Sequence, residues 1–156
     1  MIQKHEYRPK KLTEREVEKL KKQKHINFVD ALSHQIKELF IIKNPQYSGK
    51  RKLEGYKTKE FSILSEKMKK EYIYIFYPWS FSIVKIINKK YFLELKTNRN
   101  KDLITAQEQE NLKNKKVAVL GMSVGSNISL VLTQAGISND IVIADFDKLD
   151  TTNLNR

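Results

Sequence analysis

Two short segments near the C-terminal end carry residues suited to nucleotide chemistry. The first is a turn whose small residues leave room for a ligand close to the backbone. These small residues are Gly121, Ser123, Gly125 and Ser126. A phosphate is favoured at such a turn when a helix follows, because free amides and the helix dipole point at it. The second is Asp145, 20 residues after Gly125, where an acidic residue bonds ribose hydroxyls in dinucleotide-type folds.

Each of these two signals also has a plainer interpretation. The glycines stand at the first and fifth positions of the turn instead of the first, third and sixth, so a turn that binds nothing explains them about as well. An aspartate at a strand end can simply cap a loop. The tail is more specific: Asp145 is followed by Asp147 and then by Thr152-Asn153-Leu-Asn-Arg156, which is not a dehydrogenase feature.

The elements that must position these residues can be predicted from periodicity. A buried strand of the parallel-sheet kind is expected over Lys116–Gly121 and another strand over Ile141–Ala144. Between them, apolar residues at helical spacing predict a helix that Gly136 closes. The helical positions are Ile128, Val131, Leu132 and Ala135. A capping-box spacing at Thr105 opens a further helix through Leu112.

The upstream part predicts a small α+β domain of two helices and two or three antiparallel strands. A capping box at Thr13 starts a short helix to about Gln23, and Asn27 with Asp30 is expected to start a second one. That second helix has an apolar stripe and ends at Asn44-Pro45. The stripe consists of Val29, Leu32, Ile36, Leu39 and Phe40. Residues 46–60 are expected to form a loop, residues 72–87 strands, and residues 91–97 either a third strand or a short helix.

The charge distribution suggests a boundary near residue 100. Residues 1–100 hold 24 Lys and Arg against 11 Asp and Glu, a balance of +13, whereas residues 101–156 hold 6 against 7. The expected domains are a basic α+β domain over residues 1–100 and part of a nucleotide-binding domain over residues 101–156. The fold class is therefore α/β: a truncated Rossmann-like βαβ unit preceded by a small α+β domain.

Composition excludes several other classes of function. The chain has no cysteine, hence no disulfide and no thiolate chemistry, and its three histidines lack ligand spacing, so no metal site is expected. It has no apolar run of membrane-spanning length and no signal-peptide pattern, so we expect a cytoplasmic protein without a membrane partner. The lysines are expected to be solvated, and a nucleic-acid role is not favoured.

The tail and the βαβ pattern resemble the ThiF/MoeB/HesA family, the bacterial relatives of ubiquitin-activating enzymes. The signature of this family is a strand that ends in Asp-x-Asp, followed within a few residues by Ser-Asn-Leu-Asn-Arg. The resemblance covers about residues 98–156, and the segment Thr97-Asn-Arg-Asn100 before the helix that contains Glu108-Gln109 resembles a subset of the family.

The resemblance implies adenylation of a substrate carboxylate with ATP and Mg²⁺. It implies that Asp145 holds the ribose, with Asp147 beside it, that Asn153 and Arg156 contact the phosphates, and that the glycine turn lines the nucleotide. Arg99 would match a second phosphate-binding arginine, which often comes from the partner subunit of a homodimer. The implied substrates are the tail of a sulfur-carrier or ubiquitin-like protein, or a modified tRNA.

The chain also departs from the family pattern. Its turn is about one residue shorter than Gly-x-Gly-Gly-x-Gly, with Ser123 in place of a glycine. The lysine and the magnesium-binding aspartate that the family carries downstream are absent, so we expect a fragment that does not turn over alone. Two alternatives remain open from the sequence: a non-catalytic interaction module, and an NAD(P)-dependent oxidoreductase.

Overall fold

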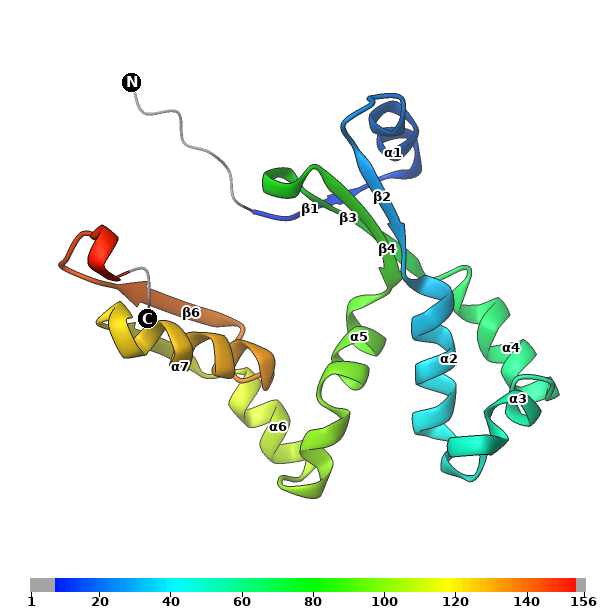
Figure 1. Ribbon diagram of the computed structural model, residues 1–156. Helices are drawn as coiled ribbons and strands as arrows, with labels where there is room; N and C mark the ends of the chain where they lie inside the picture. The colour runs from blue at the N-terminus through cyan, green and yellow to red at the C-terminus, as the bar shows by residue number, and fades with distance from the viewer. Residues whose placement is uncertain (1–7, 154–156) are drawn as a thin grey trace. The chain divides into compact units, whose positions relative to one another are not determined.

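A computed structural model describes residues 8–153 of the chain, which divides into two compact units, residues 1–95 and residues 96–156 (Figure 1). Each unit has its own sheet. Among the described residues, no helix has both the length and the apolar character needed to cross a bilayer.

Unit 1 is built on a four-stranded sheet in the order β1-β3-β4-β2. Strands β1, β3 and β4 are antiparallel neighbours, and β2 pairs parallel to β4 at the sheet edge. The strands are β1 (Lys10–Leu12), β2 (Asn27–Asp30), β3 (Tyr72–Tyr77) and β4 (Ser82–Ile87). A short 3-10 turn, η3 (Pro78–Ser80), joins β3 to β4.

Five helices accompany this sheet. They are α1 (Glu14–Lys21), α2 (Leu32–Lys43), α3 (Lys52–Gly55), α4 (Lys59–Met68) and α5 (Lys89–Lys96). The core of the unit lies where α2, α4 and α5 meet the end of β4, and its buried members are Leu32, Ile36, Leu39, Met68, Ile87 and Tyr91. Most of the predicted apolar stripe of α2 is therefore core. Val29 is the exception, because it lies on β2 and is 41% exposed.

Unit 1 differs from the prediction of two helices and two or three antiparallel strands, because its described residues form five helices and four strands, of which β2 is parallel to β4. Two segments were assigned wrongly, and residues 91–97 fall mainly in helix α5. Asn27–Asp30 forms strand β2 and not a helix start, because it pairs with β4 along its whole length. Asp30 still serves the helix that follows, since its Oδ1 accepts a hydrogen bond from the Leu32 amide at 3.0 Å. Residues 46–60 are not a loop: they contain two 3-10 turns, η1 (Pro45–Tyr47) and η2 (Gly49–Arg51), then α3 and the start of α4.

Unit 2 contains the expected βαβ arrangement. Strands β5 (Lys116–Leu120) and β6 (Asp140–Ala144) are parallel and are joined through helix α7 (Met122–Gln134). Helix α6 (Ala106–Lys113) precedes β5 and begins at a complete capping box on Thr105. The 3-10 turn η4 (Asn98–Asp102) leads into it.

The C-terminal end of α7 is closed as the sequence predicts. Gly136 has a φ of 70°, and the amides of Gly136 and Ile137 donate to the carbonyls of Thr133 and Leu132 at 3.2 and 3.0 Å. This pair of hydrogen bonds is a Schellman motif, which needs a left-handed residue and so favours glycine.

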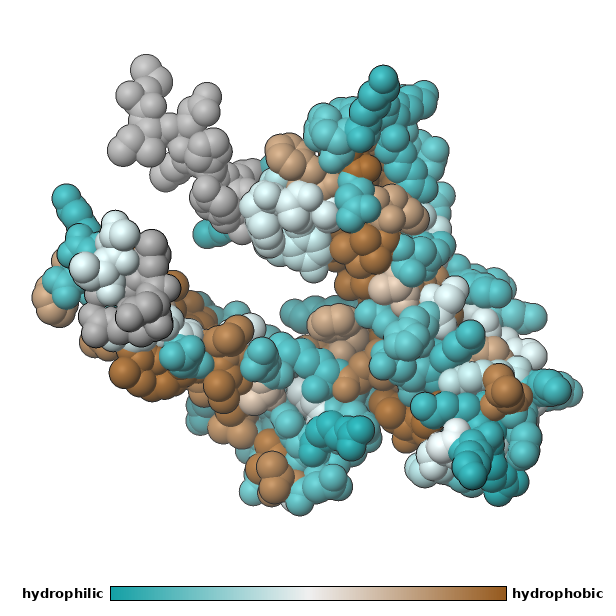
Figure 2. Space-filling view, viewed as in Figure 1, coloured by the Kyte–Doolittle hydropathy of each residue, from teal (hydrophilic) through white to brown (hydrophobic). Residues whose placement is uncertain are grey.

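The strands of unit 2 are less buried than predicted. In β5 only Val119 is buried, while Leu120 is 78% exposed, and in β6 Val142 and Ile143 are both more than half exposed. Apolar surface consequently runs along α7 and β6 (Figure 2). The physical reason is that, among the described residues, this sheet has two strands, and α7 is the helix that packs on both of them.

Candidate functional site

The turn between β5 and α7 depends on Gly121 for its conformation. This residue is the N-cap of α7 and has a φ of 87°, a region that strongly favours glycine. A Cβ there would meet no atom within 4 Å, so glycine is favoured by the backbone conformation and not by a lack of space. Its amide donates to the Ala144 carbonyl at 2.8 Å and fixes the turn against the end of β6.

Gly125 has a different role in the first turns of α7. It is buried, and a Cβ would lie 2.8 Å from Cγ1 of Val119 on β5. The absence of a side chain lets α7 pack closely on β5. Gly121 thus sets the direction of the chain in the turn, whereas Gly125 sets the packing distance between α7 and β5.

Asp145 follows β6 and caps α7 from outside the helix. Its Oδ2 accepts from the Met122 amide at 2.5 Å and its Oδ1 accepts from the Asp147 amide at 2.9 Å. The backbone hydrogen bonds from Asp147 and Met122 lower the pKa of Asp145 below its ordinary value of 3.8. An ionised carboxylate is also favoured at the positive end of the helix dipole. Because Gly121 offers no capping side chain, Asp145 supplies the missing cap.

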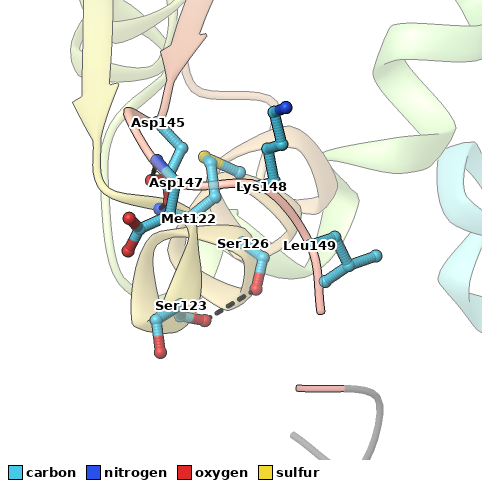
Figure 3. A pocket seen from close by; sticks show the side chains of 7 residues that line it. All are labelled: Met122, Ser123, Ser126, Asp145, Asp147, Lys148 and Leu149. Atoms are coloured by element: carbon cyan, nitrogen blue, oxygen red, sulfur yellow. Dashed lines mark hydrogen bonds between the residues drawn. The ribbon is translucent and has the colours of Figure 1, made fainter. Parts of the chain in front are cut away.

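A cavity of about 450 Å³ opens at this end of α7. Its walls are formed by Met122, Ser123, Ser126, Asp145, Asp147, Lys148 and Leu149. Figure 3 shows the two serines on the α7 side of the cavity and Lys148 and Leu149 on the chain that follows β6. Ser126 Oγ donates to the Ser123 carbonyl at 2.9 Å, which leaves the oxygen lone pairs of both hydroxyls and the Ser123 proton for other partners.

Four of the predicted site residues meet at this cavity: Ser123, Ser126, Asp145 and Asp147. Gly121 and Gly125 shape the turn behind it. Asn153 ends the 3-10 turn η5 (Thr151–Asn153), and Arg156 lies outside the described residues. Arg99 is an exposed residue of η4 and is not among the residues that form the cavity wall.

Three residues of the cavity wall were not predicted from the sequence: Met122, Lys148 and Leu149. Lys148 adds a positive charge to the site. Its position directly after Asp145-Phe-Asp147 is the sequence feature from which it could have been predicted. Met122 and Leu149 add apolar surface. Within the described part of the chain, no group of three or more His, Asp or Glu side chains could hold a metal ion.

Comparison with known families finds a match for the C-terminal part of the chain. The model of the ThiF family matches residues 95–156, a stretch that covers unit 2 and both sequence segments of the site. Residues 95–156 are thus similar to the ThiF family. The resemblance inferred from the Asp145-to-Arg156 tail is therefore confirmed over this range.

Among curated proteins, the chain is similar to the uncharacterized protein MT1398 of Mycobacterium tuberculosis (strain CDC 1551 / Oshkosh). The two are 40% identical over 81 residues, which is 52% of this chain and 11% of that protein. The chain thus spans about a tenth of the length of this relative. No solved structure matches the chain.

Proposed function

We propose that the protein takes part in ATP-dependent adenylation of a substrate carboxylate. In this reaction a carboxylate oxygen attacks the α-phosphorus of ATP, the bond to pyrophosphate breaks, and an acyl-adenylate forms. The observation that carries the proposal is the cavity at the start of α7, where Ser123, Ser126 and Asp145 come together in a ThiF-type segment. A volume of about 450 Å³ is within the range of small-molecule sites.

The residues of the cavity fit parts of a nucleotide. The carboxylate oxygens of Asp145 accept backbone hydrogen bonds and have further lone-pair capacity, so that a ribose hydroxyl can donate to them. The Ser123 hydroxyl and the Lys148 ammonium can bind phosphate oxygens, and the start of α7 favours negative charge. Met122 and Leu149 offer apolar surface to a base.

Other parts of the proposal lie beyond these residues. Asn153 and Arg156 would add phosphate contacts, and Arg99 would act from the partner subunit of a homodimer. The described residues supply no cluster for Mg²⁺, so we assign no step to the metal. The substrate class remains the tail of a sulfur-carrier or ubiquitin-like protein, or a modified tRNA, and a cytoplasmic location remains a prediction.

The test is ATP binding by the purified protein, measured as a shift in melting temperature and by calorimetry. Pyrophosphate exchange with candidate carboxylates is then measured on the full-length protein. Lys148→Ala should weaken ATP binding about tenfold through loss of a charge-assisted contact. Lys116→Ala is the matched control, because Lys116 is exposed in the same unit and is not part of the cavity wall.

The alternatives give different results in the same assay. If the chain is a non-catalytic interaction module whose glycine turn does not bind nucleotide, ATP would not change its melting temperature. An oxidoreductase would bind NADH tightly without competition from ATP. Either result would remove the adenylation proposal.

A further inference from the structure

The sheet of unit 1 has one covered face and one free face. On the covered face, Ile83 and Ile87 of β4 are 0% exposed. Helix α1 lies over this face, since Glu14 accepts a hydrogen bond from the Tyr72 hydroxyl and Lys21 Nζ lies 4.0 Å from the centre of the Phe28 ring. On the same face, Ile87 joins the core with α2 and α4.

The free face is apolar. Its apolar members are Val29, Ile73, Ile75, Tyr77, Val84 and Ile86, and the polar residues Asn27 and Ser82 lie on the same face in the row of Tyr77. The register places Val29, Val84 and Ile75 in one row across three strands and Ile86 opposite Ile73 in the next. Val29 is 41% exposed, and the other five are half-buried. An antiparallel sheet with one face towards water normally alternates apolar with polar residues, so an outward row of aliphatic residues indicates a contact surface.

Aromatic residues extend the free face at the β3–β4 turn. Tyr77 lies at the end of the face, and its ring contacts that of Trp79 edge to face, with the centroids 5.3 Å apart. Trp79 is 48% exposed, and Phe81, 52% exposed, has a φ of 49°. A bulky residue held in the left-handed region is uncommon and costs conformational energy. The turn therefore displays two large aromatic side chains that the core of unit 1 does not use.

A basic hollow adjoins the free face at its β1 edge. The row of Val29, Val84 and Ile75 continues into Lys11, and Lys11 also lines an open hollow of about 550 Å³ together with Lys69, Lys70 and Ile73. The wall also includes Leu12, Tyr72 and Tyr74 from the covered face, so the hollow borders both faces of the sheet at this edge. The one acidic residue of its wall, Glu14, is bonded to the Tyr72 hydroxyl. Among the described residues, no ion pair involves any of these three lysines.

We propose that the free face and the lysine hollow together dock an acidic polypeptide segment, whose apolar residues pack on the sheet and whose carboxylates enter the hollow. Charge complementarity favours an acidic partner, because residues 1–100 carry a net charge of +13. A second copy of the chain would bring the same positive charge to the contact. A single-stranded nucleic acid stacks on aromatic platforms, whereas five of the six apolar residues on this face are aliphatic.

The test uses the purified protein and a short synthetic peptide in which a segment of valine and isoleucine is followed by a run of glutamates. Trp79 is the only tryptophan of the chain and lies beside the free face, so its fluorescence reports binding there. Two matched peptides serve as controls: one carries lysines in place of the glutamates, and the other carries serines in place of the apolar residues. We expect only the original peptide to bind, and added salt to weaken it.

Variants of the protein separate the two parts of the surface. Lys69→Glu with Lys70→Glu should raise the Kd of the peptide about tenfold. The control pair Lys50→Glu with Lys52→Glu makes the same charge change on the exposed η2–α3 segment and should raise it about twofold or less. Val29→Thr keeps a β-branched residue at the edge strand, which preserves the fold, and should weaken binding about threefold.

Three results would overturn the inference. The first is an equal Kd of the peptide for the variant with Lys69→Glu and Lys70→Glu and for the control variant with Lys50→Glu and Lys52→Glu. The second is binding of oligo-dT, but not of the peptide, with sensitivity to the Lys69 and Lys70 substitutions. The third is self-association in sedimentation experiments that Val29→Thr abolishes, which would assign the face to a second copy.

Discussion

At the scale of single residues, Asp145 links the geometry of the βαβ unit to its charge. Its carboxylate accepts one hydrogen bond from the first residue of α7 and one from the chain after β6. An aspartate at this position therefore stabilises the turn whether or not a nucleotide is present. The structural interpretation of a strand-end aspartate and the ligand-binding interpretation are compatible, since Asp145 both holds the turn and lines the cavity.

Asp145→Asn should weaken ATP binding about tenfold, because an amide presents one acceptor oxygen where the carboxylate presents two charged ones. The variant should also melt at a lower temperature than the unmodified protein. Calorimetric titration with ATP and thermal unfolding measure the two effects. Asp140→Asn is the matched control, since Asp140 begins the same strand and lies at its opposite end. Equal ATP affinity in the Asp145 and Asp140 variants would contradict the assignment.

The stability that Asp145 contributes should depend on pH in a defined direction. Its pKa in the folded protein is lowered below 3.8, so the unfolded chain takes up this proton first as the pH falls. The contribution is complete above about pH 4 to 5 and is lost as the pH falls through the folded pKa. The difference in melting temperature between the unmodified protein and Asp145→Asn should therefore be constant near neutrality and shrink in acid. A difference in melting temperature that grows as the pH falls would contradict a lowered pKa of Asp145 in the folded protein.

At the scale of elements, the position of α7 is set at both of its ends. Near its start, Gly125 lets the helix approach Val119. After its end, the Asn100 amide donates to the Ala135 carbonyl at 2.9 Å and to Gln109 Oε1 at 2.6 Å, while the Gln109 amide donates to the Gly136 carbonyl at 3.1 Å. Asn100 comes from the segment that the resemblance singled out, and in the structure its side chain anchors the helix.

Gly125→Ala should destabilise unit 2 by about 1–3 kcal/mol, because the new methyl group would overlap Val119. Combining it with Val119→Ala should cost less than the sum of the two single changes, since the second substitution makes room for the first. Denaturant unfolding of the two single variants and the double variant measures this coupling. Strict additivity would show that Gly125 is required for another reason.

Asn100→Ala and Gln109→Ala should each cost about 1–2 kcal/mol, because each leaves half-buried polar partners without a donor. Gln107→Ala is the matched control: Gln107 lies on the same helix, and its amide bonds Asn111 on the exposed surface. Thermal unfolding of the three variants distinguishes these cases. A Gln107 effect as large as the Gln109 effect would indicate a loss of helix propensity instead of a lost anchor.

Local signals predicted those elements whose stabilising contacts are themselves local. The capping boxes at Thr13 and Thr105 and the glycine that closes α7 are in place. The start of α2 was misplaced because pairing of β2 with β4 overrides a capping signal at Asn27. The α3–α4 segment was missed because it is held by contacts distant in sequence: the Phe40 ring packs against Tyr47, Tyr56 and Phe61.

Local sequence segments also predicted part of the candidate site, but not all of its residues. Ser123, Ser126, Asp145 and Asp147 come from two contiguous segments that a βαβ unit must bring to one sheet edge. Lys148 and Leu149 lie on an irregular stretch, and no periodicity says whether such side chains face the cavity or the solvent. The free face of unit 1 depends on the register of three strands, which the sequence does not specify.

At the scale of the whole molecule, the two units differ in how completely their apolar residues are buried. Unit 1 has a core cluster of six buried residues. Unit 2 leaves residues such as Val124, Val131 and Phe146 70%, 61% and 94% exposed, and Val119 is its one buried hydrophobic residue among those described. Since burial of apolar area is the main stabilising contribution, unit 1 should be the more stable of the two.

This difference predicts two thermal transitions for the 156-residue chain, with unit 2 unfolding first. Leu39→Ala removes a fully buried side chain from unit 1 and should lower only the upper transition, by about 2–5 kcal/mol in stability. Gly125→Ala should lower only the lower transition, and ATP should raise that same transition if it binds at the start of α7. Differential scanning calorimetry of the unmodified chain and the two variants, each with and without ATP, measures all of these shifts. A single transition that moves with both substitutions would mean that the units unfold cooperatively, because stability would then be shared between the two sheets.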